Sequence, residues 1–282
     1  MATMPDSFFS WVVFLLNEYG ATLLQGAGVT LLLALVGTFI GCVIGLAVGI
    51  CQTIPEDPNG SSFKQALVKG LKAVLSSYVE IFRGTPMIVQ AMVVYYGAMS
   101  LFDIDMSAMF AGFLVVSINT GAYMAETVRG GIESIDEGQR EAAVAIGMDH
   151  FQTMRYVVLP QALRNIMPQI GNNFIINVKD TSVMFIIGFN DFFAVHKAVA
   201  GATFRFFPSA AIEMAGYLTM TLLASFLLRR LEKLLDGHAS YELVREDPLV
   251  ATAGTYNYPG KGSPYDEVNR ERPQGARKED AE

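Results

Sequence analysis

The residues of this chain best suited to chemistry are polar side chains that recur at helical spacing inside apolar segments. Asn119, Tyr123 and Glu126 are four and three positions apart, so on a helix they share one face. A later apolar segment carries a second set at similar spacing, with one cation on an adjacent face: Gln169, Asn173, Asn177, Lys179, Asp180, Thr181 and Ser182. Such groups are costly in lipid and must face protein or water. They could contact the ammonium and carboxylate groups of a small polar solute.

Each of these sets also has a structural explanation. Side-chain amides join neighbouring helices inside membranes, so Asn173 and Asn177 could hold spans together instead of touching a solute. Glu126 and Arg129 are three positions apart and could form a local ion pair. Both explanations remain open at this point.

Covalent and metal chemistry find no support in the sequence. Serine and cysteine have no partnered base at a recognisable spacing, and the three histidines lie far apart. The segment from Gly254 to Gly262 has five residues between Gly254 and Gly260, and no Ser or Thr follows Lys261, so it is not a phosphate-binding loop. We therefore expect no enzyme activity, no metal and no cofactor bound by this chain.

The composition is that of a protein with several membrane spans. The chain has 282 residues, of which 52% are hydrophobic and 17% charged, and the net charge is −7. Its mean hydropathy is positive. Residues 236–282 hold a large share of the charges, so the net charge says little about partners. Residues 1–19 lack Lys and Arg, so we expect no cleavable signal.

The apolar segments predict an all-α integral membrane protein with five transmembrane helices. These are expected at about 22–50, 86–102, 107–128, 165–189 and 209–228. Residues 1–21 are expected to form a short interfacial segment whose helix ends at Asn17 and Glu18. The helical pattern over residues 63–102 is about twice as long as a span needs, so it must break at Gly84-Thr85-Pro86, either into two helices or into one bent helix.

Four glycines in the first span are spaced for close helix packing. Gly37, Gly41, Gly45 and Gly49 recur every four positions, which lets another helix approach along a slanted line. We interpret this stripe as structural.

Basic residues indicate the orientation. With five spans, the short basic loops and flanks all fall on one side, which marks that side as cytoplasmic. The N-terminus is then outside, and both the loop 129–164 and the tail 236–282 are cytoplasmic. The tail is rich in Pro, Gly and charge, so we expect it to be disordered in isolation.

The loop 129–164 contains a candidate docking surface. Two short helices are expected at 136–147 and 149–157, before Pro160 interrupts the pattern. The second helix would expose a broad apolar surface made of Phe151, Met154, Tyr156, Val157 and Val158. This surface could fill the groove of a soluble partner, or the loop could fold back on its own spans.

Several motifs in this order resemble the permeases of ATP-binding-cassette importers. The loop carries Gly138-Gln139-Arg140-Glu141-Ala142-Ala143, then Ala145-Ile146-Gly147-Met148 and Leu159-Pro160-Gln161-Ala162-Leu163-Arg164, and it is similar to the EAA loop of that family. Arg83-Gly84-Thr85-Pro86, Ala122-Tyr123-Met124-Ala125-Glu126 and Lys179-Asp180-Thr181-Ser182 resemble the branch that takes up polar amino acids. The resemblance covers residues from about 26 to 241.

The resemblance implies a fold, partners and a mechanism. It implies the type I importer permease fold in a bacterial cell membrane, paired with a second copy or a similar permease. Further implied partners are two ATPase subunits that bind ATP and Mg, an extracellular solute-binding protein, and an amino acid such as glutamine or glutamate as substrate. No nucleic acid is expected. The residues implied for coupling to the ATPase are Gly138, Glu141, Ala142, Ala143, Gly147 and Pro160.

Two other classes of protein remain as alternatives. A secondary amino acid transporter driven by an ion gradient would also use intramembrane acids, but the loop between Arg129 and Asn165 would then have no evident purpose. A membrane enzyme is a third class. The sequence does not distinguish one polar amino acid from another.

Overall fold

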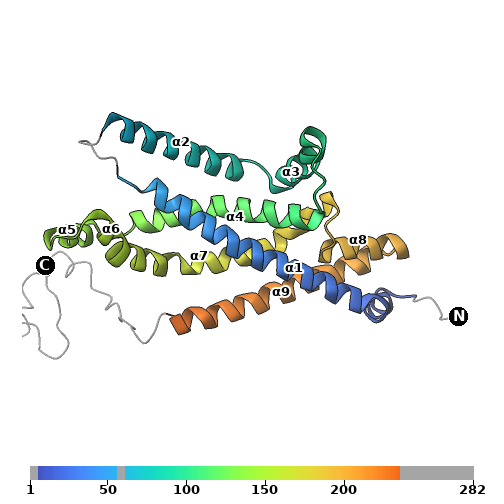
Figure 1. Ribbon diagram of the computed structural model, residues 1–282. Coiled ribbons are helices and arrows are strands. Elements are labelled where there is room, and N and C mark those ends of the chain that lie inside the picture. Colours follow the sequence, from blue (N-terminus) through green and yellow to red (C-terminus); the bar gives the residue numbers. More distant parts are fainter. Residues whose placement is uncertain (1–5, 56–60, 236–282) are drawn as a thin grey trace, which may run out of the picture. The chain divides into compact units, whose positions relative to one another are not determined.

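The computed structural model describes residues 6–55 and 61–235, and the expectation of a disordered tail at 236–282 falls outside them. The described residues form helices and connections without a strand, as predicted (Figure 1). The α-helices are α1 Phe8–Gln52, α2 Ser62–Gly84, α3 Met87–Phe102, α4 Ala108–Glu133, α5 Glu137–Ala145, α6 His150–Thr153, α7 Leu159–Asp180, α8 Phe192–Thr203 and α9 Phe206–Leu235. A π-helical segment, Met154–Val158, joins α6 to α7, and a 3₁₀ segment, Thr181–Ile187, follows α7.

Helix α1 does not break where the sequence suggested. It runs for 45 residues from a capping box at Ser7, without an interruption at Asn17 and Glu18. Both of these side chains are exposed, while Leu15 and Leu23 are buried on other faces of the helix, so the polar pair costs the helix little. At 1.5 Å per residue α1 is about 68 Å long, more than twice the hydrocarbon thickness of about 30 Å.

The predicted break at Gly84-Thr85-Pro86 is confirmed, and it produces two helices. Helices α2 and α3 meet at an angle of 110°. Pro86 lacks an N–H and disfavours a helical conformation at Thr85, whose backbone is extended. The second half of α2 packs along α4, where the Tyr78 hydroxyl donates a 2.7 Å hydrogen bond to the carbonyl of Ile118.

The count of spans depends on the bent pairs. Three helices are long and apolar enough to cross a membrane: α1, α4 and residues 206–231 of α9. The pair α2–α3 and the pair formed by residues 150–187 with α8 could each supply one more, which gives up to five. The segment 190–208, which we expected to be a connection, contains α8, whose first turn is capped by the buried Asp191.

Helices α1 and α4 pack closely along a stripe of glycines. A Cβ atom added at Gly37, Gly41, Gly45 or Gly49 would lie less than 3 Å from an α4 side chain. The α4 residues concerned are Val116, Thr120, Met124 and Val128, also four apart. The stripe therefore lets α4 lie against the backbone of α1 over several turns, which explains why both helices are buried along this line.

Candidate functional site

A charged cavity lies between the C-terminal end of α1, α2 and α4. Its volume is about 460 Å³, and it is lined by polar and ionisable side chains with one valine: Gln52, Lys72, Ser76, Val79, Glu80, Arg83, Glu126, Arg129 and Glu133. The volume is within the range of small-molecule sites. Both signs of charge are present, so the cavity can offer a cation to a carboxylate and an acid to an ammonium group.

A chain of ion pairs crosses this cavity. The Arg83 guanidinium lies 3.0 Å from one oxygen of Glu126, and Arg129 lies 2.8 Å from the other. Arg129 also pairs with Glu133 at 2.9 Å. The side chains of Arg83 and Glu126 are 40% and 39% exposed, so these pairs are worth little individually and can exchange partners.

Tyr123 extends the same face of α4. Tyr123 is 43% exposed, and the guanidinium carbon of Arg83 lies 5.7 Å from its ring centre. Tyr123 and Glu126, which the sequence placed on one face, are thus joined through Arg83 on α2. Most residues that line the cavity were not proposed for the pathway from the sequence. Among them Arg83 pairs directly with Glu126, and its position before Gly84-Thr85-Pro86 was the available signal.

Asn119, which the sequence placed on the same face, does not line the charged cavity. Its amide donates to the carbonyl of Phe82 at 3.1 Å and to the side-chain oxygen of Gln90 at 3.0 Å. Gln90, only 7% exposed, donates to the carbonyls of Phe82 and Thr85, both at 2.9 Å. The two amides satisfy carbonyl groups at the bend between α2 and α3, and so fix the end of α2 that carries Arg83.

The polar residues of α7 do not form one open stripe. The Asn177 amide donates to the hydroxyls of Thr38 at 2.8 Å and Thr120 at 2.9 Å, and so connects α7 to α1 and α4. Asn173 is also buried, and its amide contacts the sulfur of Met124 at 3.2 Å. This arrangement matches the alternative in which side-chain amides join the spans.

The end of α7 is mixed in exposure. The side chains of Lys179 and Asp180 are exposed, whereas Thr181 is fully buried. The hydroxyls of Thr181 and Ser182 donate to the carbonyls of Val178 and Lys179. Among the residues lining the charged cavity none comes from α7, so the structure does not bring these four residues together with Glu126.

The loop after α4 forms two short helices separated by Gly147. The Asp136 carboxylate caps α5 by accepting from the N–H of Gly138 at 2.7 Å. Gly147 has φ +87°, and the next N–H, of Met148, donates back to the carbonyl of Ala143 at 3.0 Å. This left-handed turn ends α5, and glycine adopts it without strain. Glu141 and Ala142 are exposed, while Ala143 is buried.

The apolar surface of this loop divides into two parts. Val158 and Met154 face inward and pack with Ile132 of α4 and Ile166 of α7. In contrast, Val144, Ile146, Phe151 and Tyr156 are 62–76% exposed. The loop therefore does fold back on its own helices through its inner face, while its outer face remains available to a partner. We call these four exposed residues the coupling surface.

The predicted interruption of the helix at Pro160 is wrong, because the chain stays helical through this residue. The chain passes from α6 through the π-helical segment into α7, and the N–H of Leu159 donates to the carbonyl of Met154, five residues back. The wider π turn accommodates a proline that has no N–H of its own. Phe151 and Tyr156 of the coupling surface are thus joined to α7 by continuous helix. In residues 6–55 and 61–235 no group of His, Cys, Asp and Glu could hold a metal ion.

Comparisons with known proteins agree on one family. Residues 60–237 match the family described as "Binding-protein-dependent transport system inner membrane component". The chain is 36% identical over 212 residues to the glutamine transport system permease protein GlnP of Escherichia coli K12, covering 75% of this chain and 91% of that protein. It is 30% identical over 216 residues to the arginine transport system permease protein ArtQ of Bacillus subtilis, covering 77% and 93%.

Solved structures show the same similarity. A crystal structure of an amino acid ABC transporter with histidines matches with a TM-score of 0.70 and 37% identity, over 81% of this chain and 99% of that chain. An inward-facing MetNI methionine ABC transporter matches with a TM-score of 0.63, over 76% of this chain and 97% of that chain. At 22% identity the second match bears on the fold alone.

Proposed function

This chain belongs to the family of inner membrane components of binding-protein-dependent transport systems, and we propose that it is the permease subunit of an ATP-driven importer of polar amino acids. The observation that carries the choice of substrate class is the charged cavity between α2 and α4. An amino acid presents one carboxylate and one ammonium group, and the cavity offers Arg83 and Glu126 side by side.

The substrate is recognised in the cavity by taking the place of each partner in the Arg83–Glu126 ion pair. The substrate carboxylate displaces Glu126 from Arg83, while the substrate ammonium group takes the freed Glu126 oxygen. Because the side chains of both residues are about 40% exposed, this exchange costs little desolvation. Glutamine and arginine, named in the relatives, share these two groups, so the cavity recognises the common part of such substrates.

ATP is bound and hydrolysed with Mg in a separate ATPase dimer, which docks on the coupling surface. Motion then reaches the cavity through packed side chains. Val158 of the loop packs in one cluster with Ile166 of α7 and with Val128 and Ile132 of α4. Glu126 precedes Val128 by two residues, so a shift of the loop moves the wall of the cavity and supports alternating access.

The complete importer contains further subunits. We propose a second permease, either another copy or a similar chain, and an extracellular solute-binding protein that delivers the amino acid. The N-terminus lies outside the bacterial cell membrane and the C-terminus inside, as the basic flanks favour. Membership in a binding-protein-dependent family supports this reading over an ion-gradient transporter.

The experiment is uptake of labelled glutamine and arginine by the complete importer reconstituted in vesicles. We expect uptake that requires ATP and the solute-binding protein and persists when proton and sodium gradients are collapsed. Uptake that continues without ATPase subunits but stops with the gradients would refute the proposal. Arg229→Gln, on α9 and outside the charged cavity, serves as a control for loss of a cation in general.

A further inference from the structure

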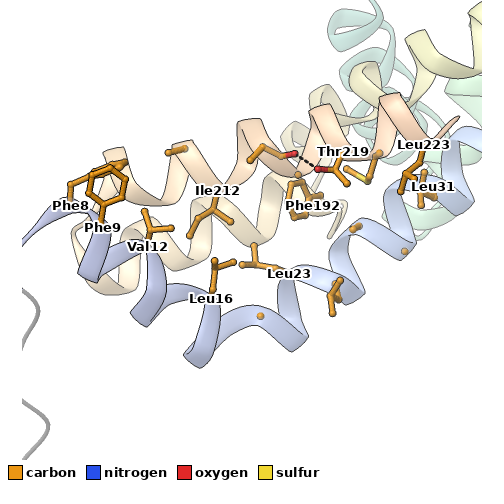
Figure 2. Close-up of a pocket in the computed structure, with 18 residues that line it drawn as sticks. Phe8, Phe9, Val12, Leu16, Leu23, Leu31, Phe192, Ile212, Thr219 and Leu223 are labelled. Carbon is orange, nitrogen blue, oxygen red and sulfur yellow. Dashed lines mark hydrogen bonds between the residues drawn. The ribbon is translucent and has the colours of Figure 1, made fainter. Parts of the chain in front are cut away.

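An apolar groove runs between the N-terminal half of α1 and α9, at the end of the bundle away from α5 and α6 (Figures 1 and 2). Its volume is about 870 Å³. Among the described residues that line it, Thr219 carries the one polar side chain, and its hydroxyl donates to the carbonyl of Ala215 at 2.7 Å. The groove therefore suits a hydrocarbon ligand.

Two glycines of α1 leave the groove open. A Cβ atom added at Gly20 or Gly28 would meet nothing within 4 Å, whereas at Gly26, on another face of α1, it would meet Val195 at 2.9 Å. Gly20 and Gly28 thus do not serve the packing of this chain on itself. Phe8, Phe9 and Leu16 line one end of the groove, as Figure 2 shows.

Two cations lie near that end, although neither lines the groove itself. The guanidinium carbon of Arg205 lies 4.5 Å from the ring centre of Trp11, a buried residue of α1 that follows Phe8 by three positions and does not line the groove. Phe207, two positions further, packs on Phe8 with ring centres 5.1 Å apart. The Lys197 ammonium lies 5.7 Å from the ring centre of Phe206. Stacking uses the face of a guanidinium and leaves its in-plane N–H groups for a phosphate.

We propose that this groove binds an anionic phospholipid, with an acyl chain along α1 and α9 and the phosphate at Arg205 and Lys197. The groove is apolar along its length and has two cations near one end. It is therefore complementary to a phospholipid, which is apolar along its length and negative at one end. A second copy of this chain docked here about a two-fold axis would bring a second Arg205 and Lys197 to the same end, where like charges repel.

The sole tryptophan of the chain allows a direct test. The full-length chain is reconstituted in phosphatidylcholine vesicles that contain a small fraction of either phosphatidylglycerol or phosphatidylcholine with brominated acyl chains, which quench nearby tryptophan. We expect brominated phosphatidylglycerol to quench Trp11 several-fold more effectively. A cation near an anionic lipid contributes about fivefold in affinity, so Arg205→Gln and Lys197→Gln should each lower this preference by up to about fivefold, and the double variant should bring it to parity.

Matched variants separate the groove from general effects. Arg230→Gln removes an arginine of α9 that also stacks on an aromatic ring, at 4.9 Å from the ring centre of Phe226, and should leave the preference unchanged. Ala215→Phe fills the groove and should reduce quenching by both lipids, whereas Leu218→Phe, on α9 but outside the groove, should not. Equal quenching by the two lipids in the unmodified chain would overturn the proposal. So would a loss of association between chains in Ala215→Phe with lipid preference unchanged.

Discussion

The turn at Gly147 allows the coupling role of the loop to be tested without a steric clash. Gly147 has φ +87°, and an added Cβ atom would meet nothing within 4 Å, so a substitution acts only through backbone conformation. A left-handed conformation costs a residue other than glycine about 1–2 kcal/mol. In Gly147→Ala the equilibrium between the left-handed turn and other backbone conformations therefore shifts about 5- to 30-fold away from the turn. A β-branched residue shifts it further, whereas asparagine tolerates this conformation.

The assay is ATPase activity of the assembled importer, stimulated by the loaded solute-binding protein, together with uptake in vesicles. We expect Gly147→Ala to lower both several-fold and Gly147→Val to abolish them, while Gly147→Asn stays close to the unmodified protein and all variants insert normally. Gly130→Ala is the matched control, since its Cβ also meets nothing but its backbone is helical. If Gly147→Ala and Gly130→Ala behaved alike, the reasoning would be refuted.

Three further substitutions test other parts of the structure. Gly45→Ala should lower stability by about 1–3 kcal/mol through overpacking against α4, whereas Gly97→Ala, with open space, should not; equal thermal unfolding of the two would contradict the packing. Asn177→Ala should lower stability by about 1 kcal/mol, from two interhelical hydrogen bonds of about 0.6 kcal/mol each, and leave the KM for uptake unchanged; a raised KM at normal stability would instead make it a pathway residue. Gln90→Leu should cost about 1–3 kcal/mol by leaving carbonyls at the bend unpaired, and normal unfolding and uptake would count against that role.

The features that could be predicted from the sequence are those with a local chemical cause. Proline and glycine chemistry predicted the break at Gly84-Thr85-Pro86, and the left-handed turn at Gly147 follows from the same chemistry. The repeat of four between glycines predicted a close helix contact, although it could not identify α4 as the partner.

The features that the sequence did not predict depend on contacts between distant residues. Arg83 and Glu126 are 43 positions apart, and only the packing of α2 on α4 brings them together. Helical spacing placed Asn177 on a polar face, but it could not show that Thr38 and Thr120 occupy its amide. Asn17 and Glu18 suggested a helix end, yet neighbouring buried leucines keep α1 continuous.

Binding of an amino acid between Arg83 and Glu126 is the central claim, and charge-selective competition tests it most directly. Uptake of the labelled substrate is measured in competition with analogues that lack either the carboxylate or the ammonium group. A partly exposed ion pair contributes up to about 1 kcal/mol, so Arg83→Gln should lower kcat/KM by up to about fivefold and remove discrimination against the analogue without a carboxylate. Glu126→Gln should remove discrimination against the analogue without an ammonium group. Unchanged discrimination in both variants, with Arg229→Gln as the control, would contradict the account.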